Sequence, residues 1–141
     1  MVKPRPDGYH SVTPYLVVEN VPKVIDFLKA TFDAIEIERH HDDRNRIVHA
    51  EVRIGDSIVM LGQAMEGFPS MPTSLYVYVA DTDATYRRGL KSGGKSLREP
   101  ADQFYGDRNA GVLDGCGNKW WIATHVEDIS PDELARRAKK A

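Results

Sequence analysis

The chain has 141 residues, of which 41% are hydrophobic and 28% charged, and its formal net charge is −2 at pH 7. This length fits one domain, and a chain of this size buries roughly 68–70% of its unfolded surface without a disulfide or structural metal. The near-neutral charge without a basic stripe excludes a typical nucleic-acid binder, and no apolar run reaches the ~20 residues of a membrane span. With a single cysteine, we expect one cytoplasmic domain over residues 1–141, with no nucleic-acid or membrane partner.

The first half of the chain predicts a strand, a helix and three further strands. β-Branched and aromatic residues over 12–18 are typical of a strand. A helix is expected next, because Asn20 can cap it and Pro22 fits its first turn. The following strands are expected at 35–40, 47–54 and 57–61, which gives a first module over about residues 12–65.

The second half repeats this pattern over about residues 74–126. The segment that starts at Ser74 aligns with the one that starts at Thr13, and such self-similarity indicates duplicated units. Asp81 or Asp83 caps the second helix, and strands are expected at 74–79, 96–99, 110–113 and 119–124. A capping box at Ser130 predicts a short C-terminal helix over 130–140. We therefore expect an α+β fold of two βαβββ modules that together enclose a ligand-sized cavity.

Several motifs resemble those of the glyoxalase/bleomycin-resistance/dioxygenase (vicinal oxygen chelate) superfamily. They are Pro14-Tyr-Leu, Asp26-Phe-Leu-Lys, His49-Ala-Glu and Ile54-Gly-Asp-Ser. The segments Gln103-Phe-Tyr-Gly-Asp-Arg108 and Trp121-Ile-Ala-Thr-His125 are similar to its PhnB-like branch. The resemblance implies a glyoxalase-like cup-shaped sheet, a small-molecule ligand and commonly a homodimer.

Metal-dependent members of that superfamily carry four ligands at matched strand positions. The resemblance places Thr13, Met60, Ser74 and Trp121 at those positions. None is a reasonable ligand, because zinc, nickel and iron sites use His, Cys, Asp or Glu. We therefore expect no metal and no cofactor, assign no catalytic residue, and leave open whether the chain is an enzyme.

Strand alternation predicts which side chains line the cavity. In the segment 48–54 the apolar residues share the face that packs on a helix, while His49, Glu51 and Arg53 share the other. These three groups either contact a polar ligand or form an ion network that fills the cavity. Tyr15, Tyr76 and Trp121 either line the pocket or pack in a core or dimer interface.

The polar-aromatic loop 103–108 is a further candidate, because such loops often carry function on a rigid scaffold. Tyr105 and Arg108 are its candidate ligand contacts, and the alternative is a salt link of Asp107 or Arg108 that fixes the loop against the neighbouring strand. His40 and His41 are expected at a solvated hairpin tip, and Cys116 is expected to be incidental.

These patterns favour a metal-independent small-molecule-binding protein whose ligand, a metabolite or an antibiotic, is unknown. Its predicted contacts are Thr13, Tyr15, His49, Glu51, Met60, Ser74, Tyr76, Tyr105, Arg108 and Trp121. One alternative is a metal-dependent lyase, isomerase or dioxygenase with a displaced site built from His49 and Glu51, with His125 as a further ligand. Another is a non-catalytic dimeric interaction module. The sequence leaves open whether the modules pair within or between chains.

Overall fold

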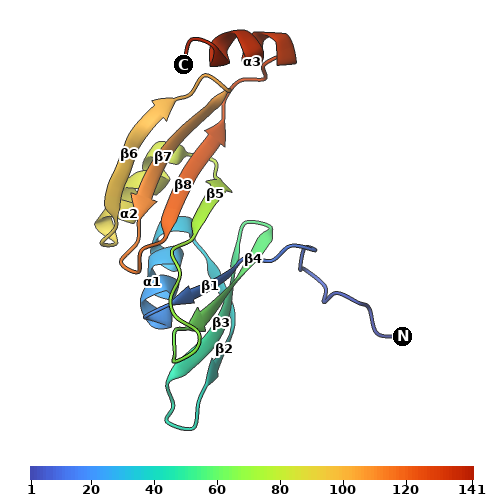
Figure 1. Cartoon of the computed structure of the whole chain (residues 1–141), viewed down its shortest axis with the longest axis vertical. Helices are drawn as coiled ribbons and strands as arrows, with labels where there is room; N and C mark the ends of the chain where they lie inside the picture. The colour runs from blue at the N-terminus through green and yellow to red at the C-terminus, as the bar shows by residue number, and fades with distance from the viewer.

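The computed structural model describes all residues, 1–141, and confirms the expected α+β order of two βαβββ modules and a C-terminal helix (Figure 1). The first module holds β1 (Tyr15–Val18), α1 (Val21–Phe32), β2 (Ile35–His41), β3 (Ile47–Ile54) and β4 (Ser57–Gln63). The second holds β5 (Ser74–Tyr78), α2 (Thr82–Lys91), β6 (Lys95–Asp102), β7 (Asp107–Leu113) and β8 (Lys119–His125). The last helix is α3 (Pro131–Ala138).

Each module forms one four-stranded mixed sheet, and the two sheets have the same topology. Their strand orders are β1-β4-β3-β2 and β5-β8-β7-β6. The first strand of each module pairs in parallel with the last, which places Tyr15 beside Met60 and Tyr76 beside Trp121. The other pairs are antiparallel, and the outer strands β2 and β6 each contain register shifts.

The helices begin where side-chain caps satisfy their free backbone N–H groups. Asn20 Oδ1 accepts a hydrogen bond from the Lys23 N–H at 3.1 Å, and Asp81 Oδ1 accepts one from the Ala84 N–H at 3.1 Å. The second helix is therefore capped by Asp81. The helix α1 ends at Asp33, whose φ of 54° lies in the left-handed region.

One hydrophobic core joins the two modules. The helices α1 and α2 pack against each other and against the sheets, and Phe27 and Phe32 of α1 lie 6.5 and 5.7 Å from the buried ring of Trp120 on β8. In β3, Ala50 and Val52 are fully buried in this core, which confirms the predicted helix-facing side of that strand. Since the core is continuous, we expect the modules to unfold together.

The other face of each sheet, which we call its open face, carries no helix. Figure 1 shows the two sheets following one another along the long axis of the molecule. On the open faces Tyr15, Tyr76 and Tyr78 remain 54%, 43% and 63% exposed. Helix packing between the modules leaves both open faces outward in a single chain, and a cavity enclosed by the two modules stays a prediction.

Some element bounds also differ from expectation. The strand β7 begins at Asp107 rather than at Ala110, and β1 begins at Tyr15, so Thr13 precedes the strand. No helix of the structure combines the length and apolar character that a membrane crossing requires.

Candidate functional site

An aromatic wall stands on the open face of the second sheet. It consists of Tyr76 and Tyr78 from β5 and Trp121 from β8. The indole of Trp121 lies against Gly111, where an added Cβ would be only 2.5 Å from Cζ3 of the ring. The indole N–H donates to Ser74 Oγ at 2.9 Å, which fixes its orientation. These residues therefore form a positioned apolar surface that is open to solvent.

The tyrosine hydroxyls of this wall are held by one buried carboxylate. Asp107, only 4% exposed, accepts hydrogen bonds at Oδ2 from Tyr76 Oη at 2.6 Å and from Tyr78 Oη at 2.9 Å. Burial alone would raise the pKa of Asp107, but donation by the tyrosines and by His125 outweighs it and lowers that pKa. Burial together with the Asp107 carboxylate raises the pKa of Tyr76, and the bond to Asp107 raises that of Tyr78. Both phenols therefore stay protonated as donors.

His125 closes this network at the end of β8. Its Nδ1 lies 2.9 Å from Asp107 Oδ1, and its Nε2 lies 2.7 Å from Asp128 Oδ1. The bonds to Asp107 and Asp128 raise the pKa of His125. Because carboxylates engage both ring nitrogens, neither nitrogen of this imidazole is free to accept a proton from a ligand.

Asn109 lies beneath the wall on β7. It is 2% exposed, and its Nδ2 donates to Tyr105 Oη at 2.7 Å and to Tyr76 Oη at 3.2 Å. Its Oδ1 has no hydrogen-bond partner, which is unusual for a buried polar atom. The structure thus places Tyr105 beside Tyr76, as two of the predicted contacts.

A hollow of about 400 Å³ adjoins this wall. Ser74, Tyr76 and Tyr78 line it from the second module, and the β3–β4 turn at 55–57 lines it from the first. The aromatic wall therefore has a neighbouring recess that both modules of the chain help to form.

The open face of the first sheet carries the other predicted contacts. Tyr15 lies over Gly62, where an added Cβ would be 2.6 Å from the tyrosine hydroxyl, and its ring centroid is 5.8 Å from that of His49. His49 Nε2 is 3.1 Å from Glu51 Oε2. Thr13, Glu51 and Met60 line a hollow of about 680 Å³ that the N-terminal segment 4–11 partly covers.

Arg108 lies apart from the other candidates. Its Nε and Nη2 bind the carboxylate of Asp83 at 2.6 and 2.9 Å, and its Nη1 binds Asp102 at 3.3 Å. Asp83 belongs to α2, so Arg108 points to the helix side of the sheet. The structure therefore shows the salt link that the sequence left open as an alternative, and ligand contact by Arg108 stays a prediction.

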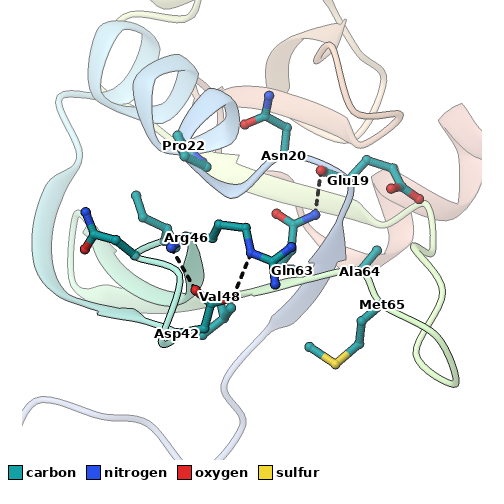
Figure 2. A pocket seen from close by; sticks show the side chains of 11 residues that line it. Glu19, Asn20, Pro22, Asp42, Arg46, Val48, Gln63, Ala64 and Met65 are labelled. Atoms are coloured by element: carbon teal, nitrogen blue, oxygen red, sulfur yellow. Dashed lines mark hydrogen bonds and ion pairs between the residues drawn. The ribbon is translucent and has the colours of Figure 1, made fainter.

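A larger hollow of about 860 Å³ lies between the start of α1 and the β2–β3 hairpin (Figure 2). Several of its polar groups are paired with one another: Arg46 Nε binds Asp42 at 2.8 Å, and Gln63 Nε2 donates to the Glu19 carbonyl at 2.6 Å. None of the predicted contacts lines it.

The positions where metal-dependent relatives hold their ion do not fit a metal in this chain. Ser74 Oγ accepts the indole N–H of Trp121, and Thr13 Oγ1 donates to the His10 carbonyl at 3.3 Å. Met60 offers a thioether and Trp121 only a donor, so these four residues supply no imidazole, thiolate or carboxylate. No reaction step is routed through a metal at these positions.

Comparison with known proteins agrees with the fold. The family model of the Glyoxalase/Bleomycin resistance protein/Dioxygenase superfamily matches residues 8–122, and the chain belongs to this superfamily. An uncharacterized protein of Mycobacterium bovis is 33% identical over 135 residues, covering 88% of this chain and 89% of that protein. An uncharacterized protein of Mycobacterium tuberculosis is also 33% identical over 135 residues, and the match covers 88% of this chain and 79% of that protein.

Solved structures show the same fold. The crystal structure of TioX from Micromonospora sp. ML1 superposes with a TM-score of 0.72 at 22% identity, covering 83% of this chain and 99% of that one. A glyoxalase/bleomycin resistance protein/dioxygenase from Nocardioides has a TM-score of 0.62 at 18% identity, with 92% and 90% covered. At these identities the likeness establishes the fold alone.

Asn109 is not among the residues predicted from the sequence, and Asp107 is predicted only as a salt link of the loop, which the structure shows with His125 on the neighbouring strand. The signal that could have found both as site residues is the alternation of β7, in which residues 107, 109 and 111 share one face. The predicted strand begins at Ala110, so this alternation falls outside it.

Proposed function

We propose that this chain is a metal-independent small-molecule-binding protein that holds a flat, largely apolar ligand, a metabolite or an antibiotic, against the wall of Tyr76, Tyr78 and Trp121. The observation that carries the proposal is that Asp107 fixes two tyrosine hydroxyls from below while their rings stay exposed. A wall positioned before binding loses little side-chain freedom when a ligand arrives.

The chemistry of the wall favours an aromatic ligand with a polar substituent. Each favourable aromatic contact contributes about 0.5–1.5 kcal/mol beyond the burial of area. The guanidinium carbon of Arg98 lies over the Trp121 ring, 5.2 Å from its centroid. A ligand that stacks on this face of Trp121 would displace Arg98 and could pair an anionic or strongly polar group with its charge.

A homodimer is part of this proposal. One chain leaves the open faces of both its sheets uncovered, and the equivalent residues Tyr15 and Tyr76 stand on the first strand of each module. If the first module of one copy covers the second module of another, twofold symmetry closes two identical sites. Light scattering of the purified protein should then give about twice the 15.8 kDa chain mass. A stable 15.8 kDa species at working concentration would contradict the dimer.

Two finer assignments rest on the sequence alone. The motif around Gln103–Arg108 and the one around Trp121–His125 support the PhnB-like branch of the superfamily. The single cysteine, Cys116, which allows no disulfide within the chain, is the basis for placing the protein in the cytoplasm.

The ligand test is a saturation-transfer NMR screen of one- and two-ring aromatic fragments against the untagged protein. Fragments that bind the wall should lose most of their signal with Trp121→Ala and keep it with Met65→Ala, an exposed residue of the other hollow. Unchanged binding in Trp121→Ala would place the fragments elsewhere and overturn the proposal. A dimer that binds no fragment would favour the interaction module instead.

A further inference from the structure

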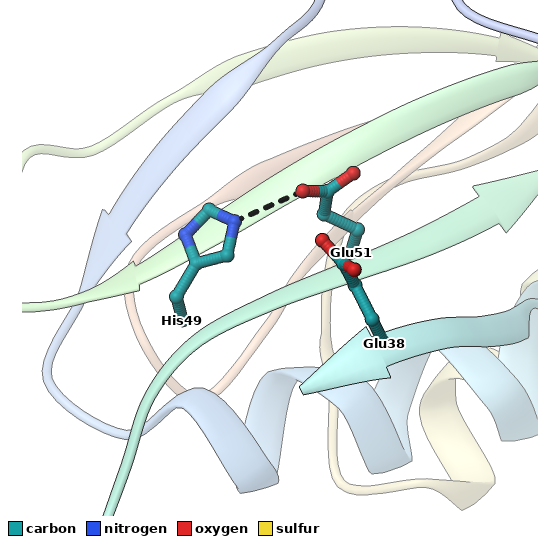
Figure 3. Close-up of side chains that lie close together, drawn as sticks. All are labelled: Glu38, His49 and Glu51. Carbon is teal, nitrogen blue, oxygen red and sulfur yellow. Dashed lines mark hydrogen bonds and ion pairs between the residues drawn. The ribbon is translucent and has the colours of Figure 1, made fainter. Parts of the chain in front are cut away.

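Two carboxylates and an imidazole converge on the open face of the first sheet, away from the aromatic wall. Glu38 comes from β2, and His49 and Glu51 come from β3 (Figure 3). Each residue offers one atom that could bind a metal ion, and these three atoms lie within 4.8 Å of one another. The three residues occupy none of the four positions that the superfamily resemblance marks for a metal.

The pairing of the two glutamates is unfavourable without a counter-charge. Glu38 and Glu51 are directly opposite one another on adjacent strands, and like charges so placed destabilise a sheet. The Glu51 side chain is only 7% exposed, so water screens its charge poorly. Neither carboxylate forms an ion pair with a lysine or an arginine. The site therefore holds concentrated negative charge without a permanent cation.

The surrounding groups leave the carboxylates available to an ion. His40 Nε2 is 3.4 Å from Glu38, and His49 Nε2 is 3.1 Å from Glu51, so the only ion pairs of these carboxylates are with imidazoles. Arg5 lines the same hollow, but its Nη1 donates to Ser11 Oγ at 2.8 Å.

Tyr9 supports the cluster from the N-terminal segment. Its hydroxyl donates to Oε1 of Glu51, while Oε2 faces His49. Hydrogen bonds from neighbouring groups of this kind orient the carboxylate ligands of metal sites. Tyr9 would thus act as a positioning residue for Glu51.

We propose that Glu38, His49 and Glu51 form a binding site for a divalent transition-metal ion on the open face of the first sheet. One imidazole and two carboxylates suit zinc, manganese or iron(II), whereas calcium and magnesium prefer oxygen alone. Ligand atoms on one tetrahedral zinc lie about 3.3–3.6 Å apart. The two ligand atoms that lie farthest apart, within 4.8 Å, must therefore approach each other by about 1 Å. The Glu38 side chain is 43% exposed and can make this movement.

Three protein ligands leave coordination positions for water or a bound molecule, which is the arrangement of an open rather than a structural zinc site. The ion would also replace the repulsion between the glutamates by attraction. This inference does not depend on the aromatic wall of the second sheet, and either site can exist without the other.

The test is isothermal titration of Zn²⁺ into untagged protein stripped with chelator, with Mg²⁺ as a second probe and Co²⁺ absorption as a report of coordination. We expect one Zn²⁺ per chain, little Mg²⁺ binding and proton release on binding. Glu38→Gln and His49→Gln should each weaken Zn²⁺ binding by more than about tenfold. The matched controls are Glu99→Gln on the equivalent outer strand β6 and His41→Gln at the hairpin, and both should bind as the unsubstituted protein does.

Two outcomes would overturn the site. One is sub-stoichiometric Zn²⁺ in the folded protein. The other is Zn²⁺ affinity unchanged by Glu38→Gln and His49→Gln but lost in His41→Gln, which would place the ion at the hairpin. Circular dichroism of each variant establishes that the fold persists, so that lost binding reports on the ligands.

Discussion

His125 and Asp107 lie directly opposite one another on β8 and β7, with Nδ1 of the imidazole 2.9 Å from Oδ1 of the carboxylate. The bonds to Asp107 and Asp128 raise the pKa of His125 above its ordinary value of 6.5. Because the pKa is higher in the folded state, the contact contributes its full share to the free energy of unfolding below pH 6.5. This contribution is lost as the pH rises through the folded-state pKa of His125.

His125→Gln should therefore cost more stability at about pH 6 than at about pH 8.5, because the charged pair exists mainly at the lower pH. Urea unfolding of both proteins at the two pH values measures this difference. His41→Gln, an exposed histidine, should show no such pH dependence. An equal cost of His125→Gln at both pH values would show that the imidazolium contributes nothing.

Asp107→Asn should lower the free energy of unfolding at neutral pH by about 1–3 kcal/mol, because two tyrosine hydroxyls and an imidazole lose a charged acceptor. The pKa of Asp107 is lowered in the folded state. Its contribution to the free energy of unfolding is therefore lost in acid, as the pH falls from about 3.8 through the folded-state pKa. Asp102→Asn, at an exposed carboxylate, should stay within about 0.5 kcal/mol in the same urea experiment.

Asp114→Ala should be the most damaging substitution of a turn residue. The Asp114 carboxylate accepts from the backbone N–H groups of Cys116 and Asn118 and from the indole of Trp120 at 2.8 Å. Losing it leaves several buried donors unpaired, which should cost at least about 3 kcal/mol. Thermal unfolding measures the loss, with exposed Asp43→Ala as the control. A near-neutral Asp114→Ala would show that water replaces the carboxylate.

Gly111→Ala should displace the Trp121 ring, because the new methyl group would lie 2.5 Å from Cζ3 and 2.8 Å from Cε3. The ring is at the surface and can move, so we expect a modest loss of stability but increased acrylamide quenching of tryptophan fluorescence. Trp120, the other tryptophan, is fully buried and contributes little to quenching. In the control Gly115→Ala the methyl group meets only the flexible end of Lys23, so the quenching should not change.

Most of the fold was predictable because the sequence repeats itself and caps its helices. The alternation of β3 correctly separated the core residues Ala50 and Val52 from His49 and Glu51. The packing of the modules was not predictable, since it depends on long-range contacts such as Phe32 against Trp120. Local sequence patterns do not indicate which faces of the helices and sheets pack together.

The candidate site was predictable only in part. Tyr76 and Trp121 were found because aromatic residues in alternation mark one face of a strand. Glu38 and Tyr9 were not predicted, and Asp107 was predicted only as a salt link of its loop. Their other partners lie far along the chain: Asp107 binds residues 29 and 31 positions away, and Tyr9 reaches Glu51 across 42 positions. No local sequence motif predicts such a contact.

The register shifts in β2 and β6 affect more than the geometry of their own sheets. Both strands lie at the outer edge of a sheet, where unpaired N–H and C=O groups could template the addition of another chain. The shifts at Glu36/Glu38 and Arg98/Ala101 interrupt the regular spacing of those groups, and charged side chains flank them. These irregularities therefore disfavour the pairing of either exposed edge with another chain.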